Sequence, residues 1–569
     1  MSLLTISNLS IQFKSRDSIH TALEPINFEI KKASVCGIVG ESGSGKSITS
    51  LTIMGLLPKS AIKYGSIVYH SSTGPIELLN LNEEAYRKFR GNKFAMIFQE
   101  PMTSLNPVIK CGKQVAEAIA LHQDLTEEEI KSKVIALFEE VKLPRPEKIF
   151  DSYPHEISGG QKQRVMIAMA LSSNPELLIA DEPTTALDVT VQKTIIDLLK
   201  QIKENRGMSI LFISHDLGLV SQIADEVLVM KQGKLIESNT STQIFKHPKE
   251  SYTKGLIACK PNIKNSLKRL ATIADFEESA LSPNEVLDRL KIDHQAYTSK
   301  REKLYNSNPI LEIKNLSKYY QINTGLFSTS KEKVYAVNNV NLNLYKGESL
   351  GLVGESGCGK TTLGRSVLRL IEPNAGQIIY NGVDLLSLNS QTLRSYRSKI
   401  QIIFQDPYSS LNPKFTIGES LIEPMMVHGI AQSKTERMSK VMETLLNVGL
   451  KEEHYYRYPH EFSGGQRQRI CIARTLVLEP ELIICDESVS ALDVSVQAQV
   501  LNLLSDLKDK YQLTYLFISH DLSVIKHFSD RIVVMKKGEI IEQGFPEEIY
   551  YHPKMEYTKE LIASIPTWE

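Results

Sequence analysis

Two glycine-rich stretches of this chain have the residue types and the spacing of a phosphate-binding loop. Residues 40–47 read GESGSGKS, and residues 354–361 read GESGCGKT. Glycines let a backbone wrap phosphate oxygens, the lysine places a cation on the β- and γ-phosphates, and the last hydroxyl coordinates Mg²⁺. Each stretch lies between a buried-strand pattern and a helix pattern, which predicts two nucleoside triphosphate sites. The predicted loop residues are Gly40, Glu41, Ser42, Gly43, Ser44, Gly45, Lys46 and Ser47, and Gly354, Glu355, Ser356, Gly357, Cys358, Gly359, Lys360 and Thr361.

Paired carboxylates follow an apolar run in each half of the chain. Asp181 and Asp486 end runs typical of buried strands, where a carboxylate can hold the magnesium shell. Glu182 and Glu487 come next and are placed to orient or deprotonate an attacking water. A solvated turn is the alternative for one such pair, but the same context occurs twice. We therefore predict hydrolysis of the bound triphosphate.

A glutamine and a histidine in each half complete the predicted catalytic set. Gln99 and Gln405 follow strand-like runs, where each could reach Mg²⁺ or water, although a surface position is equally compatible. His215 and His520 end apolar strands and precede an aspartate, so we expect them to contact the γ-phosphate rather than to serve packing alone. The predicted Mg²⁺ ligands are Ser47, Gln99, Asp181, Thr361, Gln405 and Asp486.

One aromatic side chain near the start of each half could stack on a nucleotide base. Phe13 and Tyr320 lie in strand-like segments. A single aromatic in a strand is also an ordinary core residue, so both alternatives stay open. We predict the stacking role.

A second glycine turn in each half lacks the Lys-Ser/Thr pair that finishes a phosphate loop. Residues 155–164 read HEISGGQKQR, and residues 460–469 read HEFSGGQRQR. A serine and two glycines at a helix start can present backbone N–H groups to an anion. The sequence alone leaves open which anion these turns meet. The residues are Ser158, Gly159, Gly160 and Gln161, and Ser463, Gly464, Gly465 and Gln466.

The chain contains one domain written twice. ELLIADEPTTALDVTVQ at 176–192 returns as ELIICDESVSALDVSVQ at 481–497, and other segments repeat in the same order. The spacing between the copies at 176–192 and 481–497 is far longer than a solenoid repeat, so the repetition indicates two whole domains. We predict domains at 1–260 and 309–569, each with a C-terminal extension. The linker, 261–308, is polar and mixed in charge, and we expect a solvated tether with one or two helical turns.

Short apolar runs alternate with helical patterns within each half, which predicts an α/β fold. VCGIVG and SILFIS are apolar on both faces, as buried parallel strands must be, and Gly233 marks a late hairpin. Sixty-six basic and 66 acidic residues balance, so no electrostatic footprint for nucleic acid is expected. We expect no signal peptide, no membrane span and no cysteine-ligated metal.

With these motifs in one order, twice, the chain resembles the ATP-binding-cassette family. The resemblance implies two P-loop NTPase domains in tandem, each with a mixed-sheet core, a helical subdomain and a short C-terminal extension, which hydrolyse ATP with Mg²⁺. It further implies head-to-tail pairing, in which the turn at 158–160 meets the γ-phosphate held by Lys360, and the turn at 463–465 meets that held by Lys46. Since neither half has lost its glutamate, histidine or signature serine, we expect two hydrolysing sites. The resemblance also implies that Asp188 and Asp493 lie at the interface between the paired halves.

The ends of the two halves resemble one branch of that family. HPKESYTKGLIACKP at 247–261 and HPKMEYTKELIASIP at 552–566 are similar to the extension of cassettes that energise oligopeptide, dipeptide and nickel uptake. The resemblance implies a fused ATPase subunit for peptide import, with glutathione, microcin-like peptides and nickel chelates left open as cargo. It implies two transmembrane permease subunits, an extracytoplasmic substrate-binding protein, and a peripheral position on the cytoplasmic face of the inner membrane, reached only through the permeases.

A soluble tandem cassette acting on ribosomes or nucleic acid is the alternative. Such proteins also lack membrane spans, but they carry a long, strongly basic linker between their cassettes. The linker here has mixed charge and the whole chain is neutral, so it offers no phosphate-contacting surface of the kind RNA requires. We expect no nucleic-acid partner.

Overall fold

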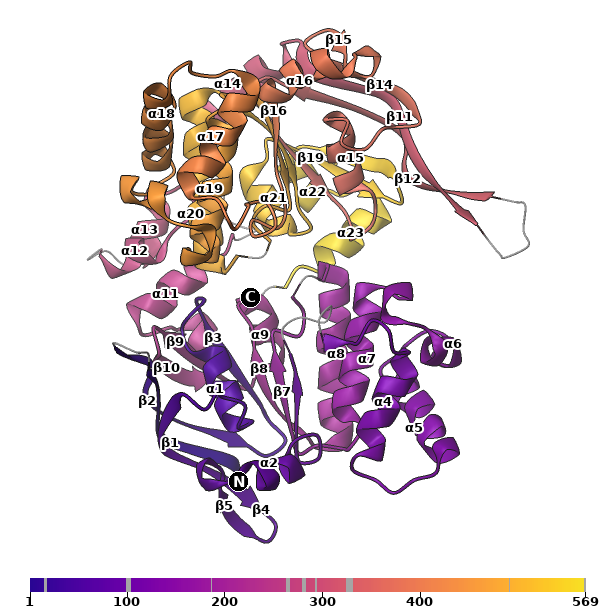
Figure 1. Cartoon of the computed structure of the whole chain (residues 1–569), viewed down its shortest axis with the longest axis vertical. Coiled ribbons are helices and arrows are strands. Elements are labelled where there is room, and N and C mark those ends of the chain that lie inside the picture. Colours follow the sequence, from indigo (N-terminus) through magenta and orange to yellow (C-terminus); the bar gives the residue numbers. More distant parts are fainter. Residues whose placement is uncertain are drawn as a thin grey trace. The chain divides into compact units, whose positions relative to one another are not determined.

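The computed structural model describes residues 1–14, 18–98, 104–185, 187–261, 267–278, 283–291, 294–323, 331–490 and 492–566. These residues form two compact units, chiefly residues 1–257 and residues 258–565 (Figure 1). The two units contain nearly the same succession of strands and helices, as the internal repeat predicts.

The first unit contains an antiparallel sheet and a mixed sheet within its described residues. The antiparallel sheet has the order β2 (Ile19–Lys31), β1 (Ser2–Lys14), β4 (Ala61–Ser71) and β5 (Gly74–Glu77). The mixed sheet has the order β10 (Lys234–Thr240), β9 (Glu226–Lys231), β3 (Val35–Gly40), β8 (Ser209–Ile213), β7 (Leu177–Asp181) and β6 (Phe94–Ile97). Strands β9 to β6 run parallel, and β10 is antiparallel to β9, so the predicted late hairpin around Gly233 is confirmed.

The helices of the first unit connect and flank these strands. Helices α4 to α7 lie together beside the mixed sheet and form the expected helical subdomain (Figure 1). The helices are α1 (Lys46–Ile53), α2 (Glu83–Phe89), α4 (Cys111–Ala120), α5 (Glu127–Glu140), α6 (Pro146–Asp151), α7 (Gly159–Leu171), α8 (Val189–Arg206), α9 (Leu217–Ile223), α10 (Ser241–Lys246) and α11 (Ser251–Ala258).

The core of the first unit lies between its two sheets. Every residue of β3, β7 and β8 is buried, because helices or the second sheet cover both faces of these parallel strands. Ile6 and Ile11 of the antiparallel sheet belong to the same hydrophobic cluster as Ile38 and Leu211 of the mixed sheet. The continuous apolar runs in the sequence therefore place rigid strands beneath the loops that leave their carboxyl ends.

The second unit repeats this plan within its described residues. Its antiparallel sheet has the order β12 (Lys331–Tyr345), β11 (Pro309–Asn323), β14 (Ala375–Tyr380) and β15 (Val383–Asp384). Its mixed sheet has the order β16 (Ile400–Ile403), β17 (Leu482–Asp486), β18 (Thr514–Ile518), β13 (Ser349–Val353), β19 (Arg531–Lys536) and β20 (Glu539–Gly544). Its helices are α15 (Lys360–Val367), α16 (Ser390–Lys399), α17 (Ile417–His428), α18 (Lys434–Asn447), α19 (Gly464–Leu476), α20 (Val494–Tyr511), α21 (Leu522–Phe528), α22 (Pro546–Tyr551) and α23 (Glu556–Ala563).

The segment between the repeats is more ordered than a solvated tether with one or two helical turns, so that expectation is wrong for its described residues. It contains α12 (Ile273–Glu277), α13 (Pro283–Arg289) and α14 (His294–Tyr305). The Asn502 side chain accepts a hydrogen bond from the Leu270 N–H at 2.8 Å and donates one to the Leu270 carbonyl at 2.9 Å. The Tyr305 hydroxyl donates to the buried Glu348 carboxylate at 3.1 Å. Polar composition did not reveal these anchors, because each depends on a partner far away in sequence.

Helix length, cysteine burial and possible metal-ligand clusters bear on the predicted membrane and metal features of the chain. Among the described residues, no helix combines the length and the apolar character that a membrane crossing requires. All six cysteines fall within the described ranges and are buried thiols. No group of three or more cysteine, histidine or carboxylate side chains in the described parts is arranged to hold a metal ion.

Candidate nucleotide sites

The first lysine loop joins the end of β3 to the start of α1. Gly40 has a φ of 151°, and a Cβ there would lie 2.1 Å from the carbonyl oxygen of Met230, so the position requires glycine. Gly45, with a φ of 100°, turns the chain into the helix. The Lys46 ammonium is buried and donates hydrogen bonds of 2.8 Å to the carbonyl oxygens of Gly40 and Glu41. The loop thus holds a cation inside a tight backbone turn at a helix N-terminus, which suits a polyphosphate.

The second lysine loop has the same construction between β13 and α15. A Cβ on Gly354 would lie 2.2 Å from the carbonyl oxygen of Met535. The Lys360 ammonium donates to the carbonyl oxygens of Gly354 and Glu355 at 2.7 and 2.9 Å, and it lies 3.9 Å from the sulfur of Cys358. The structure therefore builds both predicted loops alike, with the lysine bonded to the loop's first two residues.

Oxygen ligands suited to Mg²⁺ lie beside each loop. The Ser47 hydroxyl is 3.3 Å from a carboxylate oxygen of Asp181, and the Thr361 hydroxyl is 2.8 Å from one of Asp486. The other oxygen of Asp486 is buried and has no hydrogen-bond partner among the described residues, and it forms an ion pair with Arg365 at 3.5 Å. Because Mg²⁺ prefers carboxylate and hydroxyl oxygens, both donor sets fit this ion.

A glutamate and a histidine meet beyond the end of the parallel sheet in each unit. Nδ1 of His215 lies 3.1 Å from Oε2 of Glu182, and Nδ1 of His520 lies 3.4 Å from Oε2 of Glu487. Both glutamates have positive φ, 50° and 49°, in the left-handed region that non-glycine residues rarely adopt. Their N–H groups donate to the last residues of the neighbouring strands β8 and β18. The strained backbone therefore turns each glutamate out of its strand and toward the histidine.

The glutamates are held in the ionised form. Burial favours the neutral acid, but the hydrogen bond and the positive charge of His215 outweigh burial and lower the pKa of Glu182 to about 2. The same opposing effects lower the pKa of Glu487 below its ordinary value. Glu487 also acts on its histidine. Burial alone would lower the pKa of His520, but the hydrogen bond and negative charge of Glu487 raise it above its ordinary value. An ionised carboxylate held on a histidine can accept a hydrogen bond or a proton from water.

The glutamines predicted for the catalytic set have different outcomes. Gln405 donates a hydrogen bond of 2.9 Å to Oε2 of Glu487, so the structure brings it to the predicted catalytic glutamate of the second unit. Gln99 lies outside the described residues.

Sequence reasoning missed a hydroxyl residue beside the glutamate of the first unit. The Thr185 hydroxyl donates to the Glu182 carboxylate at 2.9 Å. The equivalent Ser490 donates instead to the Glu487 carbonyl at 2.9 Å. A hydroxyl residue three positions after each glutamate was the available signal.

The aromatic residues near the start of each unit lie in different surroundings. Phe13 in β1 is half-buried and packs against the core of the first unit. Tyr320 in β11 is 47% exposed, and the ammonium of Lys318 lies 5.1 Å from its ring centroid. An exposed ring beside a cation suits base stacking better than the partly covered ring of Phe13.

Each second glycine turn opens a helix of 13 residues. Ser158 caps α7 through a reciprocal pair, in which its hydroxyl accepts from the Gln161 N–H at 3.3 Å and its N–H donates to the Gln161 side chain at 2.9 Å. Ser463 and Gln466 form the same pair at the start of α19. Both serines are exposed, so each turn presents a helix N-terminus to solvent within its own unit.

The glycines of these turns allow a close approach to the next long helix. A Cβ on Gly160 would lie 2.8 Å from the side chain of Val191, in the first turn of α8. A Cβ on Gly465 would lie 2.3 Å from the side chain of Val496, in α20. Alanine is therefore excluded unless the valine moves. The predicted interface residues Asp188 and Asp493 are the N-cap residues of those two long helices.

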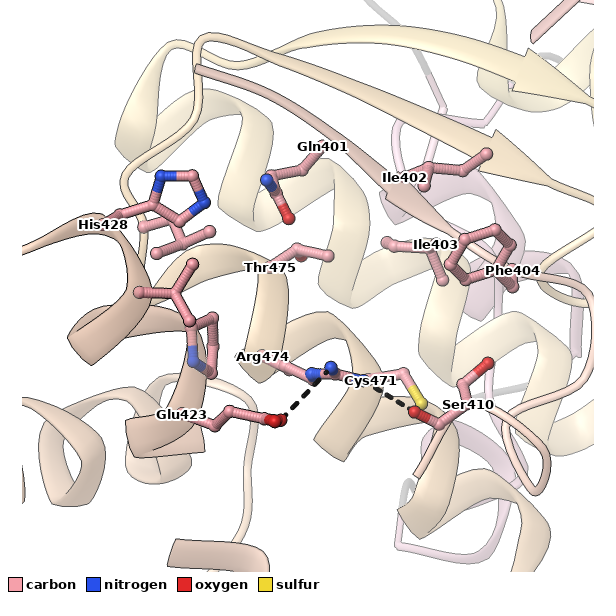
Figure 2. A pocket seen from close by; sticks show the side chains of 13 residues that line it. Gln401, Ile402, Ile403, Phe404, Ser410, Glu423, His428, Cys471, Arg474 and Thr475 are labelled. Carbon is pink, nitrogen blue, oxygen red and sulfur yellow. Dashed lines mark hydrogen bonds and ion pairs between the residues drawn. The ribbon is translucent and has the colours of Figure 1, made fainter. Parts of the chain in front are cut away.

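A cavity of about 350 Å³ lies between β16, α17 and α19 of the second unit. Arg474 crosses it, donating to the carbonyl of Ser410 at 2.6 Å and lying 3.7 Å from the Glu423 carboxylate (Figure 2). Val427 lines the cavity and is 48% exposed. Phe404 also lines the cavity and directly precedes Gln405, the glutamine predicted for the catalytic set.

Comparisons with known proteins agree with this geometry. The model of the ABC transporter family matches residues 23–185 and 337–490, and the model described as the oligopeptide/dipeptide transporter C-terminal region matches residues 236–285. The glutathione import ATP-binding protein GsiA of Salmonella paratyphi A is 44% identical over 570 residues, which cover 99% of this chain and 89% of that protein. GsiA of Escherichia coli K12 is also 44% identical, over 576 residues that cover 100% of this chain and 90% of that protein.

A solved structure is also similar to one part of the chain. The dimeric post-hydrolysis state of the ATP-binding cassette MJ0796, bound to ADP and Pi, is 31% identical and covers 42% of this chain and 98% of that chain, with a TM-score of 0.38.

Proposed function

The chain belongs to the ABC transporter family, and on that premise we propose that it is the ATP-hydrolysing subunit of a peptide importer. The observation that carries the proposal is the duplicated catalytic set: a buried lysine in a phosphate loop, an aspartate beside the loop hydroxyl, and an ionised glutamate on a histidine. Both copies of this set are complete in the described residues. Gln99, which was predicted as a further member, lies outside those residues.

Each group in the set has a defined part in hydrolysis. The loop N–H groups and Lys46 or Lys360 hold the β- and γ-phosphates. Glu182 or Glu487 orients the attacking water and accepts its proton, and this role contributes roughly 10²–10⁴ in rate. His215 and His520 hold the glutamates through Nδ1, which leaves the opposite ring nitrogen facing away from the carboxylate. We assign that nitrogen to the γ-phosphate.

Mg²⁺ is the proposed companion of ATP. Bound to Ser47 and Asp181, or to Thr361 and Asp486, it would neutralise charge on the β- and γ-phosphates. The buried oxygen of Asp486 without a hydrogen bond among the described residues supports this assignment. The glutamines Gln99 and Gln405 are proposed as further ligands.

We propose that the two units, with boundaries at 1–260 and 309–569, pair head to tail. The exposed helix N-termini at Ser158 and Ser463 support this pairing, since neither turn has the Lys-Ser/Thr pair of a phosphate loop and both can accept an anion from elsewhere. The turn of each unit then closes on the ATP held by the other unit, with Asp188 and Asp493 at the same interface. Loss of the γ-phosphate on hydrolysis releases the two units.

Import requires partners, because the described chain has no helix suited to a membrane crossing. We propose two permease subunits, a substrate-binding protein outside the membrane, and a peripheral position on the cytoplasmic face. The cavity lined by Phe404 supports permease docking, since it offers exposed apolar side chains such as Val427. It also holds the Glu423 carboxylate, which lies beside Arg474 (Figure 2). A permease helix seated there would contact the residue that precedes the catalytic glutamine.

The proposed cargo is a peptide, with glutathione as the first candidate, because the relatives similar along the whole chain are named for glutathione import. No such support exists for the alternative of a ribosome- or nucleic-acid-acting cassette. The test is uptake of labelled glutathione and of labelled dipeptides in cells that carry or lack the gene. We expect uptake of at least one of these to be lost in the deletion strain and restored by the wild-type chain. It should not be restored by a chain carrying both Glu182→Gln and Glu487→Gln. Full uptake of every peptide without the gene would contradict the proposal.

A further inference from the structure

A buried tyrosine from the C-terminal extension reaches the lysine loop in each unit. Tyr252 lies in α11 and Tyr557 in α23, and their side chains are 3% and 6% exposed. Both belong to the repeated HP-x-x-x-YT segment, for which packing alone would be a sufficient role. Their hydroxyl contacts go beyond packing, since they end on the second residue of each phosphate loop.

The contact is most direct in the second unit. The backbone N–H of Glu355 donates a hydrogen bond of 3.1 Å to the Tyr557 hydroxyl. The carbonyl oxygen of the same Glu355 accepts the hydrogen bond from Lys360 at 2.9 Å. One loop residue is therefore held on one side by the extension and on the other by the lysine that meets phosphate.

In the first unit the tyrosine reaches the equivalent loop residue through the carboxylate of that residue, and the contacts are longer. The Tyr252 hydroxyl lies 3.4 Å from the Glu41 carboxylate and 3.4 Å from the Met230 carbonyl oxygen. The carbonyl oxygen of Glu41 accepts a hydrogen bond from Lys46 at 2.8 Å. The Met230 carbonyl oxygen is the atom that leaves no room for a Cβ on Gly40. The tyrosine thus touches both sides of the loop entry, although less tightly than Tyr557 does.

The extension is fastened to its own unit, so the tyrosine is a rigid support. Glu542 of β20 accepts from the N–H groups of Lys554 and Met555, at 2.8 and 3.2 Å, and from the hydroxyl of Thr558. The ammonium of Lys536 lies 4.3 Å from the centre of the Tyr557 ring. In the first unit, Glu237 accepts from the N–H groups of Lys249 and Glu250 at 3.0 and 3.2 Å, and Lys231 lies 4.8 Å from the Tyr252 ring.

We propose that Tyr557 and Tyr252 are positioning residues for the phosphate loops, and that the C-terminal extension exists in part to supply them. The Tyr557 hydroxyl fixes the backbone of Glu355, and the Tyr252 hydroxyl holds the Glu41 carboxylate and the Met230 carbonyl. Each tyrosine so holds its loop in the shape that receives the triphosphate. Without the hydroxyl, the loop must be ordered when ATP binds, and affinity falls. This inference rests on the proposed function, in which the two loops bind ATP.

The experiment measures ATP binding to the full chain with one loop disabled at a time. In a Lys46→Ala chain, only the second site remains, and Tyr557→Phe is added to it. Loss of one hydrogen bond predicts about 2- to 10-fold weaker ATP binding. In a Lys360→Ala chain, Tyr252→Phe should give a smaller loss, because its contacts are longer. Thermal unfolding without nucleotide is recorded for every variant.

Two matched controls separate positioning from packing. Tyr515→Phe removes a buried hydroxyl that donates to the Leu504 carbonyl at 3.1 Å, away from the loop. Thr444→Val removes a buried hydroxyl in α18 that donates to the Lys440 carbonyl at 2.7 Å, away from the extension and the loop. We expect both controls to lower the unfolding temperature at least as much as Tyr557→Phe, with ATP affinity within about 1.5-fold of the parent, since additivity holds for sites without shared partners.

The outcomes are distinguishable. If Tyr557→Phe binds ATP as tightly as its parent, or loses no more affinity than the two controls, the positioning role is refuted while the proposed function stands. If the chain with one intact loop binds no ATP at all, the proposed function fails and the inference with it.

Discussion

Nδ1 of His215 lies 3.1 Å from Oε2 of Glu182, and this contact joins the ends of two neighbouring parallel strands. Glu182 directly follows the last residue of β7, and His215 lies two residues after the last residue of β8. The second unit repeats the relationship with His520 and Glu487 at 3.4 Å.

Replacing the glutamate that accepts a proton at one site should lower the ATP turnover of the chain, because the other site does not compensate for it. We expect Glu182→Gln and Glu487→Gln each to lower steady-state ATPase activity to half or less, and the double variant to lose about 10²-fold or more. Glutamine keeps the shape and the histidine contact but cannot take a proton. Wild-type turnover in either single variant would show that only one site hydrolyses ATP.

The lysines should control binding rather than chemistry alone. We expect Lys46→Ala or Lys360→Ala to reduce the stoichiometry of tight ATP binding from two per chain to one, because each removes the cation inside one loop. Equilibrium dialysis with labelled ATP and Mg²⁺ measures this. Lys399→Ala, which removes an exposed lysine paired with Glu481, is the control and should keep both sites.

The Glu487–His520 pair should make stability depend on pH. Because Glu487 raises the pKa of His520, the pair contributes stability that is fully present below the ordinary histidine value and is lost as pH rises through the raised pKa. Thermal unfolding of the wild type and of His520→Gln, from pH 6 to pH 9, measures this. The difference in unfolding temperature should shrink as pH rises, and a difference that stays constant or grows would contradict the charged pair.

Head-to-tail pairing predicts a nucleotide-dependent cross-link. We expect a chain with Ser158→Cys and Ser356→Cys to form a disulfide faster with ATP in a Glu182→Gln, Glu487→Gln background than without nucleotide. Both serines are exposed in their own units, whereas all six native cysteines are buried. The control pair is Ser158→Cys with Ser387→Cys, an exposed position outside the loop. Equal rates with and without ATP would rule out closure on the γ-phosphate.

The cavity of the second unit should matter for transport and not for ATP binding. We expect Val427→Glu to abolish peptide uptake in cells while the purified chain keeps its basal ATPase activity, because a buried unpaired charge disfavours a docked apolar helix. Leu446→Glu, at an exposed position in α18 outside the cavity, is the control and should retain uptake. Normal uptake with Val427→Glu would place the permease elsewhere.

Much of the fold and the site could be predicted from local patterns. The strands β3, β7 and β8 are continuous apolar runs, and such runs must be buried on both faces. The lysine loops lie where glycine spacing places them, because Gly40 and Gly354 have no room for a side chain. The helical start at each SGGQ turn was visible from the serine and glutamine that cap it.

Other features depend on partners that local patterns do not specify. The linker was expected to be a tether, yet Leu270 and Tyr305 are bonded to residues of the second unit more than 40 positions away. The tyrosines of the extension could only be assigned to packing, because their hydroxyls meet Glu41 and Glu355 through folding.

The sequence by itself determined which groups are present: two lysine loops, two acid pairs and two glycine turns at helix starts, each encoded by residue types at short, fixed spacing. Only the tertiary structure decided how those groups act on one another. It turned Glu182 and Glu487 out of their strands onto histidines, lowered the pKa values of these glutamates, and brought the extension beneath the loops. The physical reason is that spacing along the chain constrains only local geometry, whereas distances and charges between remote residues exist only after the sheets have packed.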